Sequence, residues 1–389
     1  MRSKRIRRAA VAFLCLVAGF ACRGSAAPLG EATVASVEQM PTTVLASPTA
    51  APTATASATA STTPPPTPAP SAPTPDRFGI FSFPPQARSW GALRDLGVGW
   101  VRLQLPIGEV DRPLVGKLSS VFDEGYGLWL TLYHRDRANV PDVGSFDQSE
   151  RGGFPAVDAD RYRALVQQTV TPLVRRLQAL GRPPAAWLVI QVANEVLPSD
   201  VAPDQSLRFW HGTSDDYLQA LDWTGEALEA LDVPIAMGGI SSEMMELILE
   251  NEAQPSARGQ AVTAWAERLL RDGHFDWVDV HLYHAVETVP ARLAWVRARW
   301  SGPLAVTELG GPDVVTGNAY SVAGHAREVE MRVPAALQNG ADRVFWTTLV
   351  ETPAFGDRYN PMALITADWE RRPAFEAYAA LIEAFPPGE

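Results

Sequence analysis

An alternation of short apolar runs with amphipathic segments of helical period is the feature that most constrains the fold of this chain. It begins at Arg77, and the runs are rich in Val, Ile, Leu and aromatic residues, as strands buried on both faces of a sheet are. The eight runs are Arg77–Phe81, Gly99–Leu105, Leu128–His134, Trp187–Glu195, Val233–Ser241, Trp277–His284, Leu304–Gly310 and Arg343–Glu351. Eight strands that alternate with helices predict the α/β class and a single (β/α)8 barrel, the TIM-barrel fold.

The segments between the runs carry helix signals. Residues 159–180, 214–231 and 321–338 each place apolar side chains at helical spacing and have polar residues or glycine at their ends. A doubly wound open sheet is the alternative architecture. That architecture requires a glycine-rich phosphate-binding loop after the first strand, and residues 81–85 read Phe-Ser-Phe-Pro-Pro.

The N-terminal segment has the features of a secretory signal. Residues 1–8 are strongly basic, and the apolar run over residues 9–21 is too short to span a bilayer. Two ends for this segment are open: lipidation at Cys22, as in the bacterial lipoprotein signals that it resembles, or cleavage near residues 25–27. We expect a signal peptide over residues 1–27, which places the protein outside the cell or on the cell surface.

A Pro/Thr/Ala-rich stretch follows over residues 28–76 and is expected to be a disordered linker, because it lacks the apolar area that offsets the entropy of ordering. The barrel then occupies residues 77–389 as the catalytic domain. The chain has 44 acidic and 33 basic side chains, which excludes a nucleic-acid partner that needs clustered Lys and Arg. Its two cysteines, Cys15 and Cys22, precede the barrel, so membrane contact is expected only through a lipid on Cys22.

Two glutamates stand at the carboxyl ends of predicted strands, where barrel enzymes place their catalytic residues. The fourth run ends in Asn194-Glu195, and the seventh contains Thr307-Glu308. The fourth and seventh strands lie across the opening of an eight-stranded barrel, so the two carboxylates face each other across a bound substrate. Cleavage of a glycosidic bond needs such a pair, because one carboxyl protonates the leaving oxygen while the other attacks the anomeric carbon or activates water.

Asn-Glu on the fourth strand and Thr-Glu on the seventh resemble the clan of retaining (β/α)8 glycoside hydrolases that includes cellulases, mannanases, family 10 xylanases and family 39 xylosidases. Further strand-end residues match this clan in order, and they are Arg102, His134, His281, Tyr283 and Trp346. The resemblance covers residues 77–389 and implies a retaining hydrolase of oligo- or polysaccharides, with β-linked substrates as the usual case.

The resemblance also implies roles for the residues on the fourth and seventh strands. Glu195 is the expected acid/base, Glu308 the nucleophile, and Asn194 the residue that binds the sugar 2-hydroxyl. Val196 departs from the pattern, because many clan members have proline after the Asn-Glu pair.

Five further residues are expected to bind substrate or to support the nucleophile. Arg102 and Tyr283 hold and ionise Glu308, Trp346 forms the floor of the sugar subsite nearest the bond, and His134 and His281 complete the set. No cofactor and no metal are expected, because the barrel lacks cysteine and a His-Glu-x-x-His helix.

Several alternatives remain open from the sequence. A barrel that binds glycans on the cell surface without turnover is the alternative function, and exo and endo action are both compatible with the residues. Aromatic residues near strand ends are expected either to line further sugar subsites or to pack the loops, and they are Tyr133, Phe154, Trp210 and Phe355.

Overall fold

The computed structural model describes residues 77–81, 86–108, 117–141, 152–203, 209–312, 320–352 and 359–385. The predicted signal peptide (1–27) and linker (28–76) lie outside these residues. Within the described ranges, no helix has the length and apolar character needed to cross a membrane.

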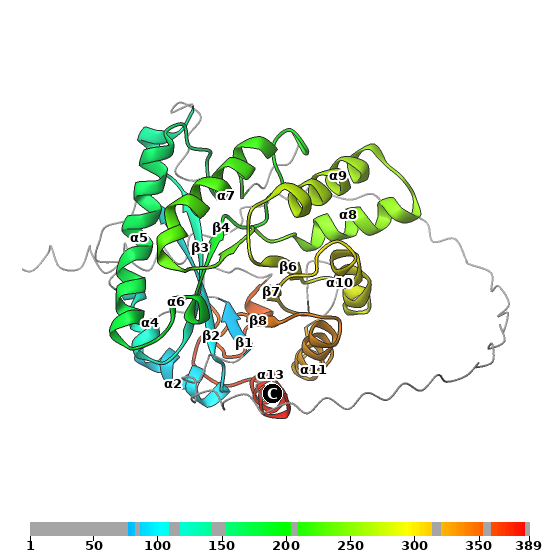
Figure 1. Ribbon diagram of the computed structural model, residues 1–389. Coiled ribbons are helices and arrows are strands. Elements are labelled where there is room, and N and C mark those ends of the chain that lie inside the picture. Colours follow the sequence, from blue (N-terminus) through cyan, green and yellow to red (C-terminus); the bar gives the residue numbers. More distant parts are fainter. Residues whose placement is uncertain are drawn as a thin grey trace, which may run out of the picture. The chain divides into compact units, whose positions relative to one another are not determined.

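Eight strands form one parallel sheet in the described part of the chain, in the order β5-β4-β3-β2-β1-β8-β7-β6 (Figure 1). They are β1 (Phe78–Phe81), β2 (Trp100–Ile107), β3 (Gly127–His134), β4 (Leu188–Val192), β5 (Ile235–Ala236), β6 (Val278–Leu282), β7 (Leu304–Leu309) and β8 (Arg343–Thr347). Parallel bridges from Ala236 to Trp277 and from Ile240 to Val280 join the two outer strands, so the sheet closes into a barrel. The predicted (β/α)8 fold is therefore confirmed, and each of the eight runs overlaps one strand.

Helices surround the sheet (Figure 1). The α-helices of the described residues are α2 (Ala87–Leu96), α4 (Ser120–Asp123), α5 (Ala159–Ala179), α6 (Pro184–Trp187), α7 (Ser214–Leu228), α8 (Ser242–Ala253), α9 (Ala257–Asp272), α10 (Val289–Arg297), α11 (Val322–Gln338) and α13 (Pro373–Ala384). Short 3-10 turns are η1 (Arg137–Asn139), η2 (Glu229–Leu231), η3 (Val286–Thr288) and η5 (Asn360–Met362). The helices expected over 159–180, 214–231 and 321–338 correspond to α5, to α7 with η2, and to α11.

The fifth strand is much shorter than its predicted run. Two glycines follow it, and each brings the backbone close to a neighbour: a Cβ on Gly238 would lie 2.5 Å from Val196 Cγ2, and one on Gly239 would lie 2.4 Å from His281 Nε2. The residues after Ala236 therefore do not extend the hydrogen-bonded strand. Their backbone instead packs closely against neighbouring strand ends.

The barrel interior has an apolar layer below a polar one. The apolar layer contains Phe81, Trp100, Trp129, Val189, Ala236, Ala305 and Phe345. The polar layer consists of Arg102, Thr131, Gln191, Asp279 and Thr307, all fully buried. On each strand the polar residue follows an inward apolar residue by two positions, because alternate side chains of a strand face the same side. The polar layer thus supports the carboxyl-end opening of the barrel, here called the mouth.

Candidate active site

The end of β4 turns two consecutive side chains into the mouth. β4 stops at Val192, and Ala193 adopts a left-handed conformation with φ 60°. A regular strand would send Asn194 and Glu195 to opposite faces. Here Asn194 contacts Arg102 and Glu195 contacts His281, so both face the barrel centre. A non-glycine residue in this backbone region is strained, and such strain is typical of functional sites.

β7 achieves the same result with an extra residue inside the strand. On the β6 side, the register passes from Asp279–Ala305 to His281–Glu308, so two residues of β6 oppose three of β7. The β8 side shows the same excess, because Val306 and Leu309 of β7 pair with Val344 and Trp346. This bulge lets Thr307 and Glu308 both point inward, and bulges commonly redirect side chains next to active sites.

Glu308 is held by two donors. Arg102 Nη1 donates to Oε1 at 2.6 Å, and the Tyr283 hydroxyl donates to Oε2 at 2.5 Å. Burial lowers the pKa of Arg102, but the charges of Glu308 and Asp279 raise that pKa above its usual value, so the guanidinium stays charged. Burial and the Glu308 charge raise the pKa of Tyr283 well above its usual value, so the phenol keeps its proton and donates it. Arg102 and Tyr283 therefore occupy the positions beside Glu308 that the resemblance implied.

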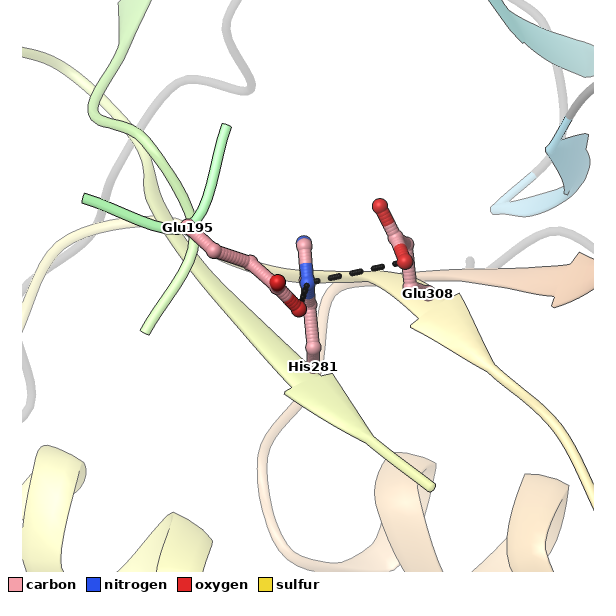
Figure 2. A group of neighbouring side chains, drawn as sticks. All are labelled: Glu195, His281 and Glu308. Carbon is pink, nitrogen blue, oxygen red and sulfur yellow. Dashed lines mark hydrogen bonds and ion pairs between the residues drawn. The ribbon is translucent and has the colours of Figure 1, made fainter. Parts of the chain in front are cut away.

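Glu195 has a different setting. His281 Nδ1 donates to its Oε1 at 2.8 Å, and the side chain keeps 19% exposure (Figure 2). Burial raises the pKa of Glu195 and the Glu308 charge adds to the rise, although His281 opposes it. One oxygen of Glu195, one oxygen of Glu308 and a ring nitrogen of His281 all lie within 4.8 Å of one another. The site therefore pairs a carboxyl group that tends to keep its proton with a carboxylate bound by a fixed cation.

His281 lies behind Glu195 and is fully buried. Its Nδ1 is bonded to Glu195 and lies 3.7 Å from Glu308 Oε2, while Nε2 lies 3.2 Å from Asp279 Oδ2. Burial lowers the pKa of His281, but Glu308 and Asp279 raise it to about 10, so both ring nitrogens donate. His281 therefore contacts Glu195 and lies beside Glu308, and its expected role as a direct substrate ligand is corrected.

Trp346 does not face the mouth, contrary to the expectation that it forms a sugar floor. It is fully buried, its indole N–H donates to the Met362 carbonyl at 2.8 Å, and its ring packs beside His325 of α11 and Tyr378 of α13. The alternation of β8 explains the error, because the inward residues there are Phe345 and Thr347. Thr347 takes the inward position, with its hydroxyl 3.2 Å from that of Tyr283.

His134 also faces away from the mouth. Thr131 occupies the interior phase of β3, so His134 lies on the outer face, with its ring 5.4 Å from that of Tyr162 on α5. Its Nδ1 lies 2.9 Å from the Phe154 carbonyl oxygen, and burial lowers the pKa of the imidazole. The expected contact of His134 with substrate is therefore corrected to a packing contact.

Two of the aromatic loop residues, Phe154 and Trp210, are buried, and Phe355 lies outside the described residues. Tyr133 belongs to β3 and is also buried, two positions after Thr131 and therefore on the interior face of the strand. Tyr359 was missed by sequence analysis; its half-buried ring lies 5.6 Å from that of Tyr283.

Apart from Arg102, sequence analysis assigned no role to the residues of the polar layer. Gln191 stands four residues before Glu195, and Asp279 stands two residues before His281, so strand alternation could have placed both below the mouth. A polar residue within a run of buried apolar residues is the signal that identifies such positions.

The cluster of Glu195, His281 and Glu308 also has the spacing of a metal site. However, both His281 nitrogens are bonded to carboxylates, and both Glu308 oxygens accept from Arg102 and Tyr283. The cationic Arg102 and His281 further disfavour a cation there. The donor set therefore fits an ion-pair network better than a metal centre.

Comparison with known proteins supports the fold. No protein-family model and no curated protein matches the sequence. The structure is similar to an exo-beta-1,4-mannosidase from Opitutaceae bacterium strain TAV5, with a TM-score of 0.53 and 16% identity over 79% of this chain and 59% of that chain. It is also similar to a glucosidase from Croceicoccus marinus, with a TM-score of 0.51 and 13% identity over 77% of this chain and 66% of that chain. The chain thus spans less than two thirds of either relative, and the likeness establishes a shared barrel.

Proposed function

We propose that this protein is a retaining glycoside hydrolase that cleaves β-linked O-glycosidic bonds by double displacement. The observation that carries the proposal is a pair of mouth carboxyls, Glu195 and Glu308, with oxygens within 4.8 Å in contrasting settings. Retaining enzymes hold their carboxyl groups about 5–5.5 Å apart, whereas inverting enzymes need about 6.5–9.5 Å to admit a water. The approach of one oxygen of each glutamate to within 4.8 Å, with His281 Nδ1 2.8 Å from Glu195 and 3.7 Å from Glu308, is consistent with the shorter, retaining spacing.

In the first step, Glu195 donates its proton to the glycosidic oxygen while a Glu308 oxygen attacks the anomeric carbon. The aglycone leaves with that proton, and a glycosyl ester forms on Glu308. In the second step, the Glu195 carboxylate takes a proton from water, the water oxygen attacks the anomeric carbon, and Glu308 leaves as a carboxylate.

Asn194 and Arg102 prepare the site for this reaction. Arg102 Nη2 donates to Asn194 Oδ1 at 2.5 Å, which turns the amide nitrogen of Asn194 away from the guanidinium. That nitrogen is a hydrogen-bond donor for the sugar 2-hydroxyl, a contact that strengthens in the transition state. Arg102 Nη1, 2.6 Å from Glu308 Oε1, orients the carboxylate before attack.

The shared barrel fold is consistent with this proposal, since the similar structures are named as a mannosidase and a glucosidase. Oligo- or polysaccharides are therefore the proposed substrates. Export to the outside of the cell or to its surface is part of the proposal, and the basic and apolar segments of residues 1–27 support it.

The test is a screen with aryl β-xylosides, β-glucosides and β-mannosides, followed by trapping with the matching 2-fluoro sugar. We expect a mass increase on the peptide that contains Glu308, and a first product with the substrate's anomeric configuration by NMR. An inverted product, or a label on another residue, would contradict the mechanism. Glycan binding by calorimetry without turnover over days would replace the proposal with a non-catalytic glycan-binding barrel.

A further inference from the structure

Asp279 is a fully buried carboxylate on β6 that lies below both catalytic glutamates. Its Oδ2 accepts from His281 Nε2 at 3.2 Å and from the Thr307 hydroxyl at 2.6 Å, and its Oδ1 accepts from the Thr307 backbone N–H at 3.0 Å. Through His281, this carboxylate is one residue removed from Glu195.

A second connection runs from Asp279 to Glu308. Gln191 Nε2 donates to Asp279 Oδ2 at 2.5 Å, and Gln191 Oε1 accepts from Arg102 Nε at 3.2 Å and Nη2 at 3.0 Å. Arg102 in turn binds Glu308. One buried carboxylate therefore supports the acid/base through an imidazole and the nucleophile through an amide and a guanidinium.

We propose that Asp279 is a positioning residue whose negative charge keeps His281 doubly protonated and thereby sets the orientation and proton affinity of Glu195, while the same carboxylate anchors Gln191 under Arg102. This inference rests on the proposed function, because it assigns Asp279 a part in the acid/base step of that reaction. It does not require Asp279 to touch substrate.

The surroundings of His281 show why the charge of Asp279 matters. Three carboxyl groups face the imidazole: Glu195 after β4, Glu308 on β7 and Asp279 on its own strand. Tyr283, also on β6, and Arg102 from β2 are directed at Glu308. β5 contributes only backbone there, since a Cβ on Gly239 would lie 2.4 Å from Nε2.

A neutral imidazole has one N–H, so it cannot donate to Glu195 and Asp279 together. Asp279 supplies the acceptor that makes the second proton favourable, and the Gly239 backbone lies close beside the ring, where a Cβ would be 2.4 Å from Nε2. Loss of the Asp279 charge would therefore remove the cation beside Glu195 and make its ionisation harder.

The first test is the pH profile of kcat/KM for Asp279→Asn. Loss of the imidazolium raises the pKa of Glu195, so the alkaline limb, the pH range in which kcat/KM falls, should move to higher pH by about 1 unit. The factor by which kcat falls should exceed the factor by which KM rises. Thr131→Val is the matched control, because it removes a neutral hydrogen-bonding group from the same buried layer and should leave the limb in place. A folded Asp279→Asn enzyme with an unmoved limb would overturn the proposal.

A second measurement needs no turnover and no change at Asp279. Imidazole ¹⁵N shifts of the wild-type protein should show one histidine that stays doubly protonated from pH 5 to 9, identified by its absence in His281→Gln. A His281 signal that titrates near pH 6.5 would refute the inference even in an active enzyme. Conversely, if His281 stays doubly protonated in a protein without glycosidase activity, the effect of Asp279 on His281 is retained and the proposed function is rejected.

Discussion

β4 and β7 each deliver one glutamate to the mouth, and they do so by different departures from regular strand geometry. β4 ends first, and the left-handed Ala193 turns the following pair inward. β7 continues past Glu308 to Leu309 and remains paired with β6 and β8 on both sides of its bulge. Glu308 is thus built into the barrel wall, whereas Glu195 stands on the segment beyond it.

The two settings differ in charge as well. Glu308 has two donors and 7% side-chain exposure, whereas Glu195 has one donor and 19%. The comparison teaches that one residue type can serve as nucleophile or as acid, according to the donors and the solvent around it. A nucleophile benefits from fixed geometry and charge, and an acid needs access to the leaving group and to water.

The largest expected effect is on the β7 side. Glu308→Gln removes the attacking oxygen while retaining the size of the side chain, so turnover of aryl glycosides should fall by about 10⁴-fold or more. Steady-state kinetics measures the loss, and Glu328→Gln, which alters an ion pair with Arg332 on α11, is the control. Substantial activity in Glu308→Gln would assign the nucleophile elsewhere.

The β4 side should respond differently. Glu195→Ala removes the proton donor, so hydrolysis of substrates with poor leaving groups should slow by about 10²–10⁴-fold. Activated aryl leaving groups need less protonation and should lose less rate, and azide should restore turnover with a β-glycosyl azide as product. Equal losses for good and poor leaving groups would remove the distinction between the two glutamates.

The sequence predicted the strands, and the meeting of Glu195 and Glu308 at one opening, because both depend on local patterns. Buried apolar runs indicate strands, and barrel topology places Glu195 and Glu308 at one opening whatever the details of pairing. The face of the strand on which each side chain lies was harder to predict. Trp346 and His134 lie on the outer face because they alternate with the interior positions of their strands, which include Thr347 and Thr131, and an error of one residue reverses the face of a side chain.

The bulge and the polar layer show a second limit of the sequence. An extra residue in β7 is visible only from its register with two strands distant in sequence. The contacts of Asp279 and Gln191 form only when β2, β4 and β6 come together, because Gln191 bonds to Met237, Asp279 and Arg102, which are 46 to 89 residues away. Their residue types stood out among apolar neighbours, but the groups to which they bond could be identified only from the tertiary structure.

The charge that fixes Glu308 should also matter for stability. Arg102→Met removes the guanidinium that binds the buried Glu308 and leaves His281 as the cation beside Glu308 and Asp279, so the free energy of unfolding should fall by about 3–5 kcal/mol at pH 7. Urea unfolding measures the change. Arg161→Met, which removes the half-exposed partner of Asp136, should cost at most about 1 kcal/mol. A similar small cost for Arg102→Met would show that the ion pair is dispensable.

The histidine between the glutamates predicts a pH dependence of stability. The pKa of His281 is raised from 6.5 to about 10, so its contribution is complete below pH 6.5 and is lost as the pH rises toward 10. His325 on α11 shows the opposite case, because burial and Arg372 lower its pKa to about 4 and stability is lost as the pH falls from 6.5 to 4.

Thermal unfolding between pH 5 and 10 tests this pair of histidines. His281→Gln should flatten the alkaline slope, and His325→Gln should flatten the acidic slope. An alkaline slope that survives in His281→Gln would place the responsible proton on another group.

The smallest expected change in stability tests the left-handed backbone at the end of β4. Ala193→Gly should relieve about 1–2 kcal/mol of left-handed strain. It should lose about 0.5–1 kcal/mol through glycine's greater freedom in the unfolded chain and about 0.8 kcal/mol through the buried methyl. The net change in the free energy of unfolding is therefore expected near zero.

Ala305→Gly on β7 is the matched variant, because Ala305 is also buried but is absent from the left-handed residues of the described chain. It suffers the same losses without the relief, so it should destabilise by about 1.5 kcal/mol. The difference between the two variants in urea unfolding isolates the strain at the end of β4. If both variants lose equal stability, the backbone before Asn194 and Glu195 is unstrained. The end of β4 would then place Glu195 at the mouth with no greater loss of stability than β7 incurs for Glu308.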